Sequence, residues 1–274
     1  KEKIILKSLD QTSLGIDSIP RRPASFPLLL NLLKNNKSSN AELANTLLSD
    51  PALATHTLKT VNSPFFRTTH ETIDSVDRAV FILGNHGIRN VISATVMMPM
   101  MKSSHSQEGI FSQKVWEWGL LSATASDQYS ELQKDNVDSI YLLGLLPALT
   151  YLVIFQSLRA INQGTSESMC DLEPSIIKSI IEKRSWKMCH DICQQWGLPP
   201  SSVKHLLDAE RPSPSTTSSP LRDGLLMGRH KVLQTNADSP INDHKAFLLT
   251  SASESIDKNV IQYLDSRVNG APIP

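Results

Sequence analysis

The stretch DPALATHTLKTVNSP at residues 50–64 carries the start and stop signals of one short helix. Asp50 belongs to the residue types preferred at an N-cap, and Pro51 follows at the first helical position, where a missing amide hydrogen costs nothing. Apolar residues then recur at helical spacing as far as Val61, and Pro64 closes the segment. The stretch therefore predicts a helix from Pro51 to the neighbourhood of Val61, with one apolar face.

Helical signals continue outward from this stretch on both sides. Upstream, Ser39 and Glu42 have the spacing of a capping box, in which each side chain accepts a hydrogen bond from an amide at the start of a helix. Downstream, a stripe of apolar residues from Val76 to Leu83 ends at Gly84, a residue suited to a left-handed helix C-cap. Further helices are expected over residues 26–33, 88–98, 115–129, 139–160, 174–182, 186–196, 201–208, 221–234 and 256–264.

The resulting prediction is an all-α fold in two parts. No segment shows the alternation that is typical of strands. The polar stretch at 102–109 marks the boundary between an N-terminal helical subdomain over residues 14–104 and a second helical subdomain over residues 105–274. The second subdomain includes the C-terminal helices and a loop or linker at 211–220, where three prolines prevent regular structure.

Composition excludes several classes of protein. The 274 residues contain 27 Lys and Arg against 27 Asp and Glu, so no overall positive field attracts nucleic acid or an anionic membrane. We therefore expect no nucleic-acid partner and no membrane partner. The three cysteines, Cys170, Cys189 and Cys193, are an odd number at spacings that fit no disulfide framework, which indicates the reducing cytoplasm.

One apolar segment has the length of a membrane span. Residues 139–158 carry no charge, but their apolar part from Ile140 to Phe155 is shorter than the roughly 20 apolar residues that a bilayer requires. We interpret the segment as buried core helix. We also expect Pro147, near its middle, to kink or divide it.

Three short patterns allow a binding interpretation beside a structural one. Cys189 and Cys193 share a helical face and suggest zinc, but the same helix is apolar, so we favour buried core cysteines. The turn at residues 84–87 before a helix is compatible with phosphate binding, but a helix-to-helix turn explains it with fewer assumptions. Phe65 and Phe66 fit a binding face and packing between helices equally well, so both interpretations stay open.

Four pieces of the sequence occur in an order shared with a known family. They are DPALA at residues 50–54, VNSPFF at 61–66, AVFILG at 79–84 and IRNV at 88–91. In this order they resemble the HDOD family, and the resemblance extends over residues 19–210. It implies an all-helical fold in which a multi-helix N-terminal bundle packs on a degenerate half related to the HD superfamily of metal-dependent phosphohydrolases.

The resemblance also identifies residues that define the family motif. These are Pro51, Asn62, Gly84 and Arg89, and we interpret all four as structural. The expected roles are, in that order, helix start, helix-end hydrogen bonding, left-handed cap and anchor of the following helix.

The metal ligands of HD enzymes are missing at the matching positions. Where those enzymes carry a His-Asp pair, this chain has Pro147 and Ala148, neither of which can bind a metal. Trp118 stands at the position of an earlier family histidine, and a further family histidine falls near Ser185. The eight histidines are scattered and form no H-E-x-x-H pattern. We therefore expect no metal, no cofactor and no catalytic residue.

These features lead us to expect a bacterial, cytoplasmic signalling protein without enzymatic activity. The resemblance implies a regulatory or scaffolding module that binds protein partners or a small signal molecule, with a cleft between the two helical parts as the place for a ligand. The alternative is a metal-dependent phosphohydrolase of the HD superfamily that acts on a phosphoester or a cyclic nucleotide. Its nearest candidate ligands are Asp138, Asp171, His190, Asp191, His205 and Asp208.

Overall fold

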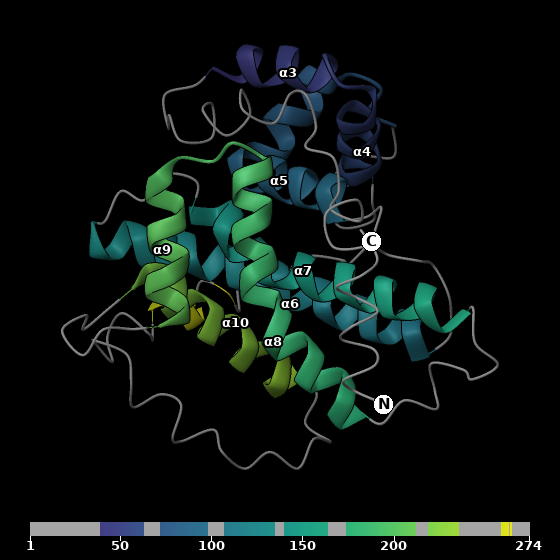
Figure 1. Cartoon of the computed structure of the whole chain (residues 1–274). Helices are drawn as coiled ribbons and strands as arrows, with labels where there is room; N and C mark the ends of the chain where they lie inside the picture. Colours follow the sequence, from purple (N-terminus) through teal and green to yellow (C-terminus); the bar gives the residue numbers. More distant parts are fainter. Residues whose placement is uncertain are drawn as a thin grey trace. The chain divides into compact units, whose positions relative to one another are not determined.

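All regular secondary structure in the described part of the chain is α-helical, which confirms the predicted fold class (Figure 1). The structure is a computed structural model, and it describes residues 39–62, 72–97, 107–134, 140–163, 174–211, 219–235, 259–262 and 264. The helix expected over residues 26–33 lies outside the described residues, as do most of the loop at 211–220 and the start of the helix expected over 256–264.

The chain divides into two compact units. Of the described residues, those from 107 to 235 form one unit, and those from 39 to 97 form the other together with the helical turn at 259–262 and Leu264. The sequence assigned this C-terminal segment to the second subdomain, whereas the structure groups it with residues 39–97. Its Val260 and Leu264 are buried, and their apolar spacing alone does not specify which unit covers them.

α3 (Asn40–Leu48) begins with the complete capping box that the sequence predicted. The Ser39 hydroxyl accepts a hydrogen bond from the Glu42 amide at 3.2 Å, and the Glu42 carboxylate accepts one from the Ser39 amide at 3.0 Å. Leu43 and Leu47 lie on the inner face and are fully buried. The cap and the apolar face thus agree on one start and one orientation for this helix.

α4 (Pro51–Val61) begins at the predicted proline. The Asp50 carboxylate accepts a hydrogen bond from the Leu53 amide at 3.3 Å, as an N-cap residue does. The buried side of the helix contains Leu53, Thr57 and Val61. The hydroxyl of Thr57 is satisfied inside the helix, because it donates to the Leu53 carbonyl oxygen at 2.7 Å.

α5 (Val76–Met97) is interrupted at the predicted glycine. Gly84 has a φ of 59° and a ψ of −174°, so two helical segments meet at a non-helical residue. The positive φ agrees with the expectation, but this ψ is that of an extended residue, so Gly84 links the segments without forming a left-handed cap. The apolar stripe before it is buried; its members are Val76, Ala79, Val80 and Leu83.

The described part of the other unit is built from helices that pack on one another. They are α6 (Gln107–Gln133), α7 (Ile140–Gln163), α8 (Pro174–Gln195), α9 (Pro200–Glu210) and α10 (Pro220–Thr235). Small residues let α6 approach two of its neighbours closely. A Cβ atom added to Gly144 of α7 would lie 2.6 Å from the Ala123 Cα of α6, and one added to Gly228 of α10 would lie 2.7 Å from the Ser122 Cα of α6.

α7 contains the apolar segment that has the length of a membrane span. Within its window Ile140–Arg159, 83% of the residues are buried in the unit, which agrees with the predicted core helix. Pro147 lies inside α7 and does not divide it, so the expected division was wrong, and the kink stays a prediction. Proline removes one backbone hydrogen bond, but burial of the surrounding side chains, among them Leu143, Leu146 and Leu149, keeps the helix continuous.

α8 is one helix where the sequence predicted two. No glycine or proline interrupts residues 183–185 between the two expected helices, so their patterns join. The helix ends in a Schellman motif: Gly197 has a φ of 63°, the Leu198 amide donates to the Cys193 carbonyl oxygen at 2.9 Å, and the Gly197 amide donates to that of Gln194 at 3.0 Å. This ending sets the turn into α9.

Candidate functional site

Trp118, which the resemblance matches to an earlier family histidine, packs between helices. Trp118 of α6 is half-buried, and its indole Nε1 donates a hydrogen bond to the Leu225 carbonyl oxygen of α10 at 3.5 Å. Its ring centroid lies 4.9 Å from that of Tyr151 on α7, with the ring planes at 56°. Trp118 of α6 therefore contacts both α7 and α10.

The other positions matched to metal ligands are buried, and none of them carries an imidazole or a carboxylate. Pro147 and Ala148 are consecutive on α7, and both are buried. Ser185 of α8 is 5% exposed. In the ranges that the structure describes, no group of three or more His, Cys, Asp or Glu side chains is placed to hold a metal ion. Within the described residues, the side chains at the matched positions do not fit the metal centre that the HD superfamily implies.

Tyr151 is the ionisable side chain that contacts Trp118. Burial raises the pKa of its hydroxyl; the positive charge of Arg229 on α10 opposes this shift, and the negative charge of Glu182 adds to it. The net shift is upward, so Tyr151 stays protonated at neutral pH. The aromatic pair is therefore uncharged, with an exposed arginine near it.

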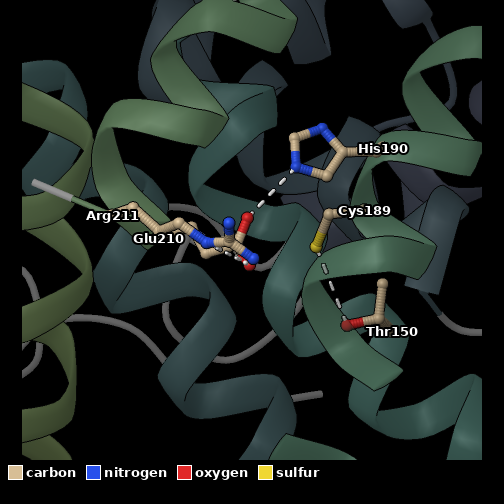
Figure 2. A network of polar contacts seen from close by, with 5 residues as sticks. All are labelled: Thr150, Cys189, His190, Glu210 and Arg211. Atoms are coloured by element: carbon tan, nitrogen blue, oxygen red, sulfur yellow. Dashed lines mark hydrogen bonds and ion pairs between the residues drawn. The ribbon is translucent and has the colours of Figure 1, made fainter. Parts of the chain in front are cut away.

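The two cysteines of α8 are buried and free. The Cys189 sulfur lies 3.9 Å from the Thr150 hydroxyl oxygen of α7 (Figure 2). Burial raises the pKa of the Cys189 thiol well above its ordinary range, and it raises the pKa of Cys193 to about 12. Metal binding and nucleophilic attack both require the thiolate, so the structure favours the interpretation of these thiols as core residues.

A polar contact joins α8 to the end of α9 (Figure 2). His190 Nε2 lies 3.5 Å from Glu210 Oε2, and Arg211 Nε lies 3.6 Å from Glu210 Oε1. The contact engages His190, one of the ligands considered for the phosphohydrolase alternative. The other candidates are half-buried on α8 and α9, as Asp191, His205 and Asp208 are, or lie outside the described residues, as Asp138 and Asp171 do.

Asn62 closes the end of α4 and also binds the chain before α5. Its Oδ1 accepts a hydrogen bond from the Ile73 amide, and its Nδ2 donates to the carbonyl oxygens of Ile73 and Leu58, each at 2.8 Å. The sequence predicted hydrogen bonding at the helix end but not the link to Ile73. No residue type or spacing in the sequence points to backbone groups 11 residues further along.

The remaining motif residues lie at separate places in the unit of residues 39–97. Pro51 is the first residue of α4, and Gly84 interrupts α5. Arg89 belongs to the second segment of α5, but its side chain lies outside the described residues. Phe65 and Phe66 lie outside them too. The structural interpretation of the motif and both interpretations of the phenylalanine pair stay predictions.

A sequence profile of the HDOD domain family matches residues 19–212 of the chain, which is more than half of its length. Comparison with curated protein sequences gives no match.

Several solved structures have a similar fold. A protein from Shewanella amazonensis SB2B, provisionally named a metal-dependent phosphohydrolase, is 15% identical with a TM-score of 0.58, over 95% of this chain and 97% of that one. An HDOD domain protein with unknown function from Geobacter sulfurreducens is 16% identical with a TM-score of 0.58, over 97% and 94%. A protein from Marinobacter aquaeolei VT8, provisionally named a signal transduction protein, is 17% identical with a TM-score of 0.60, over 96% of this chain and 63% of that one. At these identities the likeness shows the fold alone.

Proposed function

Because the chain belongs to the HDOD domain family, we propose that it is a non-catalytic module of bacterial signal transduction, which regulates or scaffolds by binding protein partners or a small signal molecule. The observation that carries the proposal is the packing of Trp118 on Tyr151, at a distance of 4.9 Å between ring centroids. Pro147 and Ala148, which precede Tyr151 on α7, are buried. Trp118, Pro147 and Ala148, which the resemblance matches to metal ligands, thus contribute to packing.

Hydrolysis at the HD centre would require a different set of ligands. A catalytic metal needs several imidazole or carboxylate donors and an open position for water. Converting Trp118 to a ligand position would break its aromatic contact and its hydrogen bond to the Leu225 carbonyl oxygen. Pro147 and Ala148 would still supply no donor. The chemistry of these positions therefore supports binding without turnover.

The names of the similar structures support this proposal only by analogy. One carries a provisional name in signal transduction and another a provisional name as a phosphohydrolase, so the names point to both functions. We give more weight to the residues of this chain. The alternative, a metal-dependent phosphohydrolase, becomes an outcome of the test below.

We also propose that the module works in the cytoplasm. Cys189 and Cys193 are free thiols in the core of the unit, a state that a reducing compartment preserves. The partner is then a cytoplasmic protein or a diffusible signal molecule.

The deciding experiment measures bound metal and turnover on one preparation of the full chain. The untagged protein is equilibrated with Mn²⁺, desalted, and analysed for metal per chain, and hydrolysis of bis(p-nitrophenyl) phosphate is followed in added Mn²⁺. We expect far less than one metal per chain and no hydrolysis above that of buffer with the same Mn²⁺. Stoichiometric metal together with hydrolysis would overturn the proposal in favour of the phosphohydrolase.

Two variants and one control show whether any trace of activity belongs to the chain. His190→Ala and His205→Ala remove the two histidines considered as ligands for the phosphohydrolase alternative. The control His56→Ala removes a histidine of α4 in the other unit. Activity that belongs to the chain falls in the first two variants and persists in the third. Activity that is equal in all three comes from a contaminant and leaves the proposal standing.

A binding measurement separates the two kinds of partner. A ligand that binds only the folded chain raises the melting temperature as its concentration rises above the Kd. Saturable stabilisation by a nucleotide without its hydrolysis would identify a signal-molecule receptor. No shift across a panel of nucleotides would direct the search to protein partners.

A further inference from the structure

α9 has a single polar side-chain link to the rest of its unit. Among the described residues, the contact between His190 and Glu210 is the one side-chain hydrogen bond or ion pair that joins α9 to another helix. In α10, by comparison, the carbonyl oxygens of Leu221 and Leu225 accept hydrogen bonds from the Ser126 hydroxyl and the Trp118 indole of α6. Among the described residues, the polar side-chain contact between α9 and another helix is therefore made by Glu210, the last residue of α9.

The docked face of α9 combines a small apolar contact with an unsatisfied polar group. Leu206 and Ala209 are its buried apolar residues, whereas Leu207 is 47% exposed. The hydroxyl of Ser202 is also fully buried, and it has no hydrogen-bond partner among the described residues. A buried hydroxyl without a partner costs free energy, which release of the helix into water would recover.

Non-helical residues flank α9 at both ends. Gly197 has a φ of 63° before the helix, and Arg211 leaves helical geometry after it, with a φ of −132° and a ψ of 80°. The N-cap residue Pro199 makes no side-chain cap hydrogen bond. The Schellman ending of α8 is complete before α9 begins, so α8 does not depend on α9 for its own termination.

We propose that α9 is a latch that opens independently of α6, α7, α8 and α10, and that the contact between His190 and Glu210 holds it closed (Figure 2). Opening returns the Ser202 hydroxyl to water and frees the side of α8 that carries His190. The inference is independent of the proposed function, because a latch of this kind could serve a binding module or an enzyme.

Native-state hydrogen exchange of the full chain tests the latch. Amides of residues 204–211 are compared with those of residues 149–158 in the core of α7, at increasing low concentrations of urea. We expect the α9 amides to exchange at least about 100-fold faster, through an opening that depends little on urea because it exposes little surface. If α9 and α7 amides exchange at the same rate with the same urea dependence, α9 opens only with global unfolding and the latch does not exist.

Two substitutions should move the latch in opposite directions. Glu210→Gln weakens the link to His190 and should make the α9 amides exchange about two- to fivefold faster. Ser202→Ala removes the unsatisfied hydroxyl and should make them exchange about fivefold to tenfold slower. The core amides of α7 should be unchanged in both variants.

The matched control is Glu182→Gln, which removes an exposed carboxylate of α8 that lies 3.8 Å from Lys178. It should leave exchange in α9 unchanged. Equal effects of Glu182→Gln and Glu210→Gln on α9, or faster exchange of α9 in Ser202→Ala, would contradict the proposed hold on the latch.

Discussion

Asn62 and Ile73 are joined by two hydrogen bonds of 2.8 Å, in which the side-chain amide of Asn62 pairs with the backbone N–H and C=O of Ile73. A third bond of the same length, to the Leu58 carbonyl oxygen, fixes the orientation of this side-chain amide on the end of α4. One side chain thus holds the end of α4 to the chain segment that enters α5. A contact between residues this far apart closes the intervening loop at its base.

Replacing Asn62 should therefore destabilise the chain more than its partial exposure suggests. Asn62→Ala removes three hydrogen bonds and should lower the free energy of unfolding by about 2–3 kcal/mol. Asn62→Asp should be at least as harmful, because its carboxylate would face the carbonyl oxygens of Leu58 and Ile73. Urea unfolding measures both, with Asn45→Ala on the exposed side of α3 as the control. A loss no larger than that of the control would show that the three bonds contribute little.

Gly84 should tolerate no side chain, for a reason that lies in the backbone. Its φ is 59°, but a Cβ atom added there would have no atom within 4 Å apart from those of its chain neighbours and of its own helix backbone. The cost of a substitution is then conformational strain of about 1–3 kcal/mol and not a clash. Gly84→Ala and Gly84→Val should consequently destabilise by similar amounts in thermal unfolding. Unchanged melting would contradict the positive φ, and a far larger loss for valine would mean that space is the limiting factor.

The elements that the sequence predicted well are those with local signals. The capping box of Ser39 and Glu42, the proline start of α4 and the break at Gly84 each depend on residues within one turn of the helix end. The interior of a helix is set by packing instead. Pro147 therefore stays inside α7, since the burial of its neighbours outweighs one lost hydrogen bond.

The sequence could not predict the contacts that define the candidate site, because they join residues that are far apart along the chain. The hydrogen bond from Trp118 to the Leu225 carbonyl oxygen spans 107 residues. The family resemblance placed Trp118, Pro147 and Ala148 at the old metal positions, yet only the fold brings Tyr151 against Trp118. Periodicity predicts which face of a helix is buried and leaves open which helix covers it.

The close approach of α6 and α10 gives a pair of opposite effects on stability. Ser122 has a buried hydroxyl without a hydrogen-bond partner, so Ser122→Ala should be neutral or stabilise by up to about 1 kcal/mol. Gly228→Ala should destabilise by about 1–3 kcal/mol, because the added Cβ would lie 2.7 Å from the Ser122 Cα. Thermal unfolding of both variants and of the double variant checks this. Since the obstruction includes backbone atoms of Ser122, Ser122→Ala should not rescue Gly228→Ala; a full rescue would refute the backbone explanation.

His56 should make stability depend on pH in a known direction. Burial, and then the positive charge of Lys59, lower the pKa of His56 below its ordinary value of 6.5. The unfolded chain then takes up the proton before the folded chain does, so this contribution to stability is present above pH 6.5 and is lost as the pH falls through the lowered pKa. Relative to the wild type, His56→Gln should gain stability between pH 7.5 and 5.5 in urea unfolding. A difference between the two proteins that is constant over this range would contradict the shift.

Substitutions of Trp118 test whether the positions that the resemblance matches to metal ligands contribute to packing in this chain. Trp118→Phe keeps an aromatic ring beside Tyr151 but loses the hydrogen bond to the Leu225 carbonyl oxygen, and should cost up to about 1 kcal/mol. Trp118→His restores the residue type of the metal-binding family and should cost about 2 kcal/mol or more, because the smaller ring loses contact area. We expect no metal uptake by this variant, since Pro147 and Ala148 add no ligand.

The measurements for Trp118 are urea unfolding and manganese per chain after desalting, with Trp118→Phe as the matched control for lost packing. If Trp118→His bound one manganese ion and melted at a higher temperature in its presence, ligands close to Trp118 would have to exist. That result would contradict the argument that Pro147 and Ala148 exclude a metal, and the non-catalytic proposal would lose its support from these positions. Loss of stability without metal uptake would instead support a packing role for Trp118.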